Sequence, residues 1–309
     1  MCDISTFQNA WFGLILLRDM PDSTTLAAPS VITRARRSLH EALAGVGAKF
    51  PASVNVHLHE HDLLEALAMR IGWERDIFFR LVPTWAFEAV VADFLRATFP
   101  HLSHLRPGAW EICDTATHGK VQIANFAQYE HLHRLKLKAE ADPDLMAALG
   151  GDYLIAPDVV VLRDAEPDEV LNQTAAIVDA ASARLSPLRA ANNAVRLRFL
   201  HASLSCKWTL RSDRAQNARS EALNLLRNRK GHAPHIVAVT AEPIPSRLAS
   251  LALGMSDLDC VYHIALPELQ AAVAECVDEE RSDQGGTLQM LVGGRRLRDI
   301  SDLPLDLAI

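Results

Sequence analysis

The chain has 309 residues, of which 49% are hydrophobic and 22% are charged. This composition is typical of a globular protein, and a chain of this length buries a full core without disulfide or metal support. The net charge of −7 argues against a nonspecific polyanion binder, and no stretch reaches the roughly 18–20 apolar residues of a membrane span. Five cysteines without a CxxC pair argue against a disulfide framework or a zinc ribbon, so we expect a cytoplasmic protein.

Charge is distributed unevenly along the chain. Residues 184–247 contain 12 Lys and Arg but only three acids, which gives this segment a net charge of +9 and leaves −16 for the remainder. A local excess of this kind indicates a basic surface for a polyanion within an otherwise acidic protein.

The first part of the chain predicts amphipathic helices. Residues 31–43 carry apolar and basic side chains at helical spacing, and Gly45 and Gly47 are expected to end that helix. Residues 61–79 and 83–99 repeat apolar side chains every three or four positions, and the second run has a proline in its first turn. Two further helices are therefore expected there.

From residue 110 onward, short apolar runs alternate with helical patterns. Strands are expected at residues 110–115, 120–126, 153–163, 195–210, 236–239, 260–266 and 287–292, and helices at 127–140, 214–228, 246–253 and 267–279. This alternation predicts an α/β fold with a central mixed β-sheet flanked by helices.

The domain organisation follows from the absence of a long linker. We expect a single domain over residues 1–309, with an N-terminal helical elaboration (1–80), a core (83–269) and a peripheral tail (285–309).

Two of the predicted strands carry groups that suit phosphodiester chemistry. Asp158 follows a proline within one strand, and Lys207 ends the next, so adjacent strands would bring a carboxylate and an ammonium together. A carboxylate is a hard oxygen ligand for Mg²⁺, and a cation near the reacting phosphate offsets its developing charge. The common pattern, Pro-Asp…(Asp/Glu)-x-Lys, would require an acid where this chain has Ser205. Glu221, about two turns into the next helix, is the natural replacement for that acid.

The segment after Lys207 has the chemistry of a base reader. In Arg211-Ser212-Asp213-Arg214, an arginine can donate two hydrogen bonds to guanine and the aspartate can accept one from cytosine. Such a pair fits adjacent G·C base pairs, close in sequence to the catalytic candidates.

The run SCKWTLRSDR, with its continuation QNARSEALNLLRNRKGHAPHIVAVTAEPIPSRLASLALG, resembles the NgoMIV family of type II restriction endonucleases, which cut GCCGGC. The resemblance extends over residues 157–269 and includes 83–95. The displaced glutamate, the Arg-Ser-Asp-Arg element and a Pro-Ser-Arg element occur in the family's order. It implies a restriction-endonuclease-like core and Mg²⁺ as cofactor.

The resemblance also assigns roles to individual residues. It implies that Asp158 and Glu221 are the metal carboxylates, that Lys207 is the catalytic lysine with Ser205 beside it, and that Glu88 is a further acid near the metal. The base readers it implies are Arg211, Ser212, Asp213 and Arg214 for the inner CCGG and Arg247 for the outer base pair. The family's other outer-pair readers come from an N-terminal region in which this sequence offers no matching motif.

The resemblance further implies an assembly and a product. Two subunits related by a twofold axis match a palindromic site, and two such dimers would form a homotetramer that binds two DNA copies. The expected cut follows the first G and leaves a 5′-CCGG overhang.

Other interpretations of the same residues stay open. Pro157-Asp158 alone is a common turn, Lys207 alone is a solvated strand end, and Glu88 is one acid on an amphipathic helix. The chain could be a DNA-binding regulator of the same fold without catalysis, or a nuclease for another CCGG-centred site. His57, His59 and His61 alternate as in a zinc site, but no fourth ligand lies at a telling spacing.

Overall fold

The computed structural model describes residues 28–51, 61–115, 123–139, 144, 156–193, 197–210, 212–253, 257–276 and 282–309. The chain divides into two units, Met1–Ser30 and Val31–Ile309, and every element below belongs to the second. Among the described residues, no helix is both long enough and apolar enough to cross a membrane.

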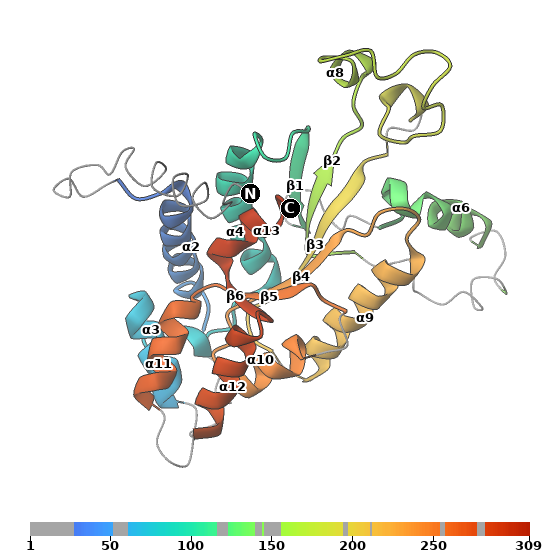
Figure 1. The fold of residues 1–309 in the computed structure, drawn as a ribbon. Coiled ribbons are helices and arrows are strands. Elements are labelled where there is room, and N and C mark those ends of the chain that lie inside the picture. Colours follow the sequence, from blue (N-terminus) through green and yellow to red (C-terminus); the bar gives the residue numbers. More distant parts are fainter. Residues whose placement is uncertain are drawn as a thin grey trace, which may run out of the picture. The chain divides into compact units, whose positions relative to one another are not determined.

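The second unit is built on one six-stranded sheet with strand order β1-β2-β3-β4-β5-β6 (Figure 1). The first three strands are antiparallel neighbours, and β3, β4, β5 and β6 are parallel, so the predicted mixed sheet is confirmed. The strands are β1 (Trp110–Asp114), β2 (Val159–Arg163), β3 (Phe199–Lys207), β4 (His235–Thr240), β5 (Cys260–His263) and β6 (Leu297–Asp299).

The central strands are apolar runs because both of their faces are covered. β2 reads VVVLR and β4 reads HIVAVT, and all but the terminal residues Arg163 and His235 are buried. Buried β-branched runs of this kind are characteristic of strands packed on both faces. The helices of this unit are α2 (Val31–Gly47), α3 (His61–Ile71), α4 (Thr84–Thr98), α6 (Glu130–Ala139), α8 (Asp168–Leu171), α9 (Ser212–Asn228), α10 (Pro245–Ala252), α11 (Leu266–Cys276), α12 (Ser282–Gly293) and α13 (Leu303–Asp306).

The helices pack in a few groups around the sheet. Helix α4 contacts β1, β2 and β3 and also packs against α2, whereas α10 packs against α9 and α12, and α3 packs against α11. Short 3₁₀ turns connect several elements, at Ile77–Phe79, Phe99–Leu102, Ile123–Asn125, Ala127–Tyr129, Ala190–Asn192 and Ile300–Asp302.

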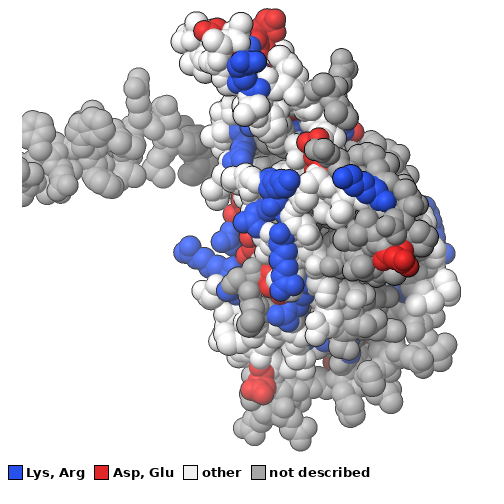
Figure 2. Space-filling model, turned by 90° about the vertical axis from the view of Figure 1, so that its right-hand side faces the viewer, with Lys and Arg blue, Asp and Glu red and all other residues white. Residues whose placement is uncertain are grey.

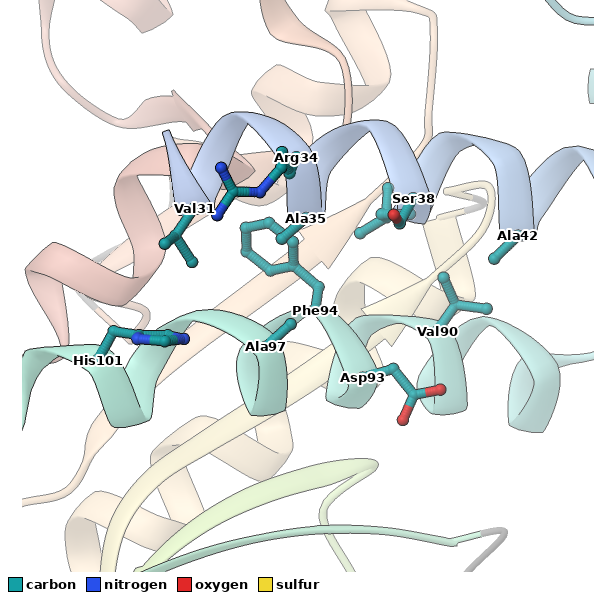
Figure 3. Close-up of a pocket in the computed structure, with 11 residues that line it drawn as sticks. Val31, Arg34, Ala35, Ser38, Ala42, Val90, Asp93, Phe94, Ala97 and His101 are labelled. Carbon is teal, nitrogen blue, oxygen red and sulfur yellow. The ribbon is translucent and has the colours of Figure 1, made fainter. Parts of the chain in front are cut away.

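An open groove of about 520 Å³ lies between α2 and α4. Figure 3 shows Val31 and Ala35 of α2 facing Phe94 and Ala97 of α4 across it. None of the predicted site residues lines this groove.

Two helix boundaries differ from those predicted. Helix α2 continues through Gly45 and ends at Gly47, so both glycines belong to the helix that they were expected to end. The predicted helix 61–79 instead ends at Ile71, and Gly72 follows with φ of +86°, a conformation that glycine adopts without steric cost. Residues 77–79 form a separate 3₁₀ turn.

Two predicted strands are wrong. Residues 287–292 lie in helix α12, where Leu288 and Leu291 are buried one helical turn apart and Gly286 meets no neighbouring side chain. Residues 123–125 of the predicted strand 120–126 form a 3₁₀ turn, and 120–122 lie outside the described residues. In both cases a short apolar run fitted strand and helix equally, and tertiary packing decided.

A long arm, described over residues 164–193, follows β2 and carries α8 near the top of Figure 1. Arg189 organises it: the buried guanidinium pairs with Asp168 at 2.5 Å and donates to the backbone oxygens of Asp179 and Ser182, both at 2.8 Å. The arm is therefore ordered by polar contacts around one arginine.

Candidate active site

The antiparallel pairing of β2 and β3 brings the predicted catalytic strand ends together. Val159 lies opposite Leu204, so Asp158, just before β2, comes beside the end of β3. Lys207 Nζ lies 2.7 Å from Asp158 Oδ2, and the backbone N–H of Cys206 donates to the same oxygen at 2.8 Å. These two contacts fix the carboxylate of Asp158 against the strand that carries the lysine.

The charge of Lys207 is maintained by its acidic neighbours. Burial opposes the charged form, but Asp158 and Glu221 outweigh this effect and raise the pKa of the ammonium above its usual value. The lysine therefore presents a positive charge within the site.

Glu221 approaches from helix α9, as the displaced-glutamate prediction requires. It lines a small cavity together with Pro157 and Ser205. Burial and the nearby charge of Asp158 raise the pKa of this carboxyl, and Lys207 partly offsets the increase. The structure thus places Glu221 within electrostatic reach of both Asp158 and Lys207.

Glu88 joins the same group from helix α4. The side chain is only 4% exposed and accepts a hydrogen bond from the Thr115 hydroxyl at the end of β1. Burial is the main cause that raises the pKa of Glu88 to about 7; Asp158 raises it further, while Thr115 and Lys207 lower it. Four predicted residues from four parts of the chain therefore share one electrostatic environment.

Ser205 lies on β3 two residues before Lys207, with 8% of its surface exposed. Its hydroxyl is buried and has no hydrogen-bond partner among the described residues. The described part of the chain contains no ready-made group of three or more His, Cys, Asp or Glu around a metal position. The site presents the carboxylates of Asp158, Glu221 and Glu88, the lysine and an unsatisfied hydroxyl, and such oxygen donors suit a hard divalent cation.

The predicted base readers fall partly outside the described residues. Arg211 lies outside the described residues. Helix α9 begins at Ser212, but the structure describes no side chain for Ser212, Asp213 or Arg214. Arg247 lies in the first turn of α10, with its Nη1 atom 3.6 Å from Glu242 Oε1 and 37% of the side chain exposed.

Sequence reasoning did not find an aromatic cluster that supports the end of β3. Trp208, directly after Lys207, is 4% exposed and stacks on Phe78 and Trp73 with ring centroids 5.8 and 6.0 Å apart. Phe87 of α4 meets the same indole edge-on at 5.6 Å. The tryptophan directly after Lys207 was the feature of the sequence that could have indicated this cluster. Because Trp208 is buried among aromatic rings, it supports the catalytic strand structurally.

The alternative zinc site receives no support. His57 and His59 lie outside the described residues, and His61 begins helix α3, where its ring nitrogen lies 3.1 Å from Glu65 one turn later. At His61 the chain is therefore helical.

The uneven charge of the sequence is visible on the molecular surface. Figure 2 shows Lys and Arg side chains gathered near the middle of the face that lies at the right of Figure 1, where α6 and α9 are. Arg227, Arg229 and Lys230, at the end of α9, are exposed. Such a surface suits contacts with phosphates.

Comparison with known proteins identifies the family of the chain. The family model described as NgoMIV restriction enzyme matches residues 82–309, a range that contains every predicted site residue. The type II restriction enzyme NgoMIV of Neisseria gonorrhoeae is 50% identical to the chain over 224 residues, which cover 72% of this chain and 77% of that protein.

Proposed function

Because the chain belongs to the NgoMIV restriction enzyme family and is a type II site-specific deoxyribonuclease, we propose that it cuts the palindrome GCCGGC. The cut follows the first G and leaves a 5′-CCGG overhang. The observation that carries this proposal is the contact between Lys207 and Asp158 at 2.7 Å, with Glu221 and Glu88 in the same electrostatic environment.

Type II restriction enzymes generally need a divalent metal, and we assign Mg²⁺ to this one. Asp158 and Glu221 would hold the ion, and the buried Ser205 hydroxyl offers a further polar contact beside them. When bound, such an ion supplies Lewis-acid stabilisation for the charge that develops on the phosphate.

The protein's own residues then have distinct tasks. Lys207 keeps its proton and places a positive charge next to the scissile phosphate, where it orients the attacking water and offsets developing negative charge. The N–H of Cys206 holds Asp158 in a fixed orientation, so the carboxylate does not reorganise during the reaction. Glu88 adds a further acid at the edge of the site.

Base reading is assigned to two segments. Arg211, Ser212, Asp213 and Arg214, which include the start of α9, read the inner CCGG, since arginine recognises guanine and aspartate recognises cytosine. Arg247 reads the outer pair from α10. A related specificity, with another base pair around CCGG, is the second candidate, because the residues that read the outer pair from the N-terminal part stay unassigned.

A palindromic site calls for a twofold-symmetric homodimer, and we propose that two dimers form a homotetramer. The arm supports association, because its large apolar residues Val170, Ile177 and Leu185 are 49%, 63% and 95% exposed on an ordered segment. We place the enzyme in the cytoplasm, in keeping with the thiols of Cys113, Cys206 and Cys260, none of which is in a disulfide.

The deciding experiment is cleavage of a plasmid of known sequence in Mg²⁺ with sequencing of the fragment ends. Wild-type protein is expected to give fragments that begin with 5′-CCGG, and Lys207→Ala to cut at least about 100-fold more slowly. Lys49→Ala, an exposed lysine just after the end of α2, serves as the control and should cut nearly normally.

Three results would change the proposal. Fragment ends at another CCGG-centred site would establish the second specificity. Binding of GCCGGC duplex in Ca²⁺ without any cutting in Mg²⁺ would favour a non-catalytic regulator. Equal rates for wild type and Lys207→Ala would remove the lysine from the mechanism.

A further inference from the structure

Glu242 is a completely buried acid whose backbone partners come just before the two base-reading segments, which are residues 211–214 and the first turn of α10 with Arg247. It follows strand β4 by two residues, and none of its surface is exposed. Burying a carboxylate without partners is strongly unfavourable, so a buried acid is expected to be fully engaged. Its partners therefore indicate its purpose.

The two oxygens of Glu242 bind the chain just before each reading segment. Oε2 accepts the backbone N–H of Leu210 at 2.6 Å, and Leu210 immediately precedes Arg211. Oε1 accepts the backbone N–H of Ile244 at 3.1 Å, and Ile244 is the N-cap residue of α10, three residues before Arg247. The same Oε1 lies 3.6 Å from the guanidinium of Arg247.

The backbone of Glu242 is in turn tied to the catalytic strand. Its N–H donates to Thr240 Oγ1 at 3.1 Å, and Thr240 lies opposite Lys207 in the parallel pairing of β3 with β4. One residue thus connects the segment after β3, the end of β4 and the start of α10.

We propose that Glu242 is a specificity-positioning residue that fixes the inner-pair and outer-pair reading segments relative to each other and to Lys207. This inference rests on the proposed function. Bidentate recognition of a base tolerates only small displacements, so a loosened Leu210 and Ile244 would misalign both segments together. The distinctive consequence is a joint loss of discrimination at inner and outer base pairs.

The test measures single-turnover cleavage of three duplexes: GCCGGC, one with a changed outer pair and one with a changed inner pair. Glu242→Gln keeps the size of the side chain but replaces one accepting oxygen with an NH₂ group that cannot accept a backbone N–H. We expect the ratio of cognate to altered-site cleavage to fall about tenfold for both altered duplexes. Arg247→Ala is expected to lower the ratio for the outer pair alone.

Asp299→Asn is the matched control. Asp299 is also a buried acid that accepts two backbone N–H groups, of Leu266 and Ser301 at 3.0 Å each, and pairs with an arginine, Arg36. None of these partners of Asp299 lies in or beside a base-reading segment. Its variant should lose thermal stability to a similar extent as Glu242→Gln while both discrimination ratios stay within about twofold of wild type.

The outcomes separate this inference from the function on which it rests. A folded Glu242→Gln protein with wild-type ratios refutes the positioning role and leaves the nuclease assignment intact. Equal losses of discrimination in Asp299→Asn also refute it, because the effect would then follow from stability. Wild-type protein without site-specific cleavage refutes the proposed function itself. Glu242→Asp, which keeps the charge but is too short to reach both N–H groups, gives the same comparison if the glutamine variant does not fold.

Discussion

Asp158 and Lys207 form a contact whose geometry is set by the backbone as much as by charge. The N–H of Cys206 and the ammonium of Lys207 converge on one carboxylate oxygen, and Glu88 and Glu221 both have raised pKa values around them. The sequence motif predicted Asp158, Lys207 and Glu221, because the order Pro-Asp, Ser-x-Lys and the displaced glutamate is visible in one dimension. Glu88 was expected only from the resemblance to the family. Glu242 was not predictable in this way, since a lone glutamate after a strand looks like any solvated loop acid until its burial is known.

Glu88→Gln is expected to stabilise the metal-free protein at alkaline pH. The pKa of Glu88 is raised from 4.5 to about 7, chiefly by burial, so the folded state binds this proton more tightly than the unfolded state. Stability therefore falls as pH rises from about 4.5 to about 7, and the full penalty is present above that range. Removing the titrating group should add on the order of 2–3 kcal/mol to the free energy of unfolding at pH 8.5, as an upper bound.

Urea unfolding in EDTA, at one protein concentration and at pH 4.5 and 8.5, measures this effect. The gap between Glu88→Gln and wild type should open as pH rises. Glu169→Gln, an exposed acid on α8, is the control and should show no such opening. A gap of constant size would mean that Glu88 does not carry the penalty.

At the scale of elements, the active site depends on how the end of β3 is held. Two devices fix it: the parallel pairing with β4, and the aromatic cluster of Trp208, Phe78, Trp73 and Phe87. Periodicity predicted β3, which is nine residues long, and β4, which is rich in β-branched residues. It misread residues 287–292, because the short mixed run TLQMLV fits either structure. The cluster joins residues far apart in sequence, which a local pattern does not reveal.

Phe78→Ala should destabilise the protein by about 3–4 kcal/mol, because a buried ring that stacks on Trp208 and packs at a tilt against Trp73 is lost and a cavity remains. At temperatures where the variant is still folded, we expect slower cleavage, since Trp208 is bonded directly to Lys207. Trp85→Ala removes an indole that is 56% exposed and should change stability by less than about 1 kcal/mol. Equal stabilities of the two variants, followed by denaturant unfolding, would contradict the supporting role of the cluster.

At the scale of the whole molecule, the alternation of strands and helices was enough to predict the mixed α/β sheet. The arm between β2 and β3 was not predictable, because it has no periodic pattern and owes its order to the contacts of Arg189. The charge asymmetry of the sequence did predict a basic face, which Figure 2 shows. Assembly depends on surfaces rather than on the core. The arm exposes large apolar side chains, so it is the described segment on which we expect subunits to associate.

Leu185→Asp should therefore weaken association without unfolding the protein. Leu185 is 95% exposed, so a charge there costs the single chain almost nothing, whereas a charge inside an apolar contact between subunits costs several kcal/mol. Sedimentation is expected to show a tetramer for wild type and smaller species for the variant, with an unchanged unfolding temperature of the subunit core. Met290→Asp places the same charge on α12 at a residue that is 53% exposed and should leave the assembly intact. If Leu185→Asp sediments as wild type does, the arm is not the contact, and the twofold symmetry required by a palindromic site must be formed by another surface.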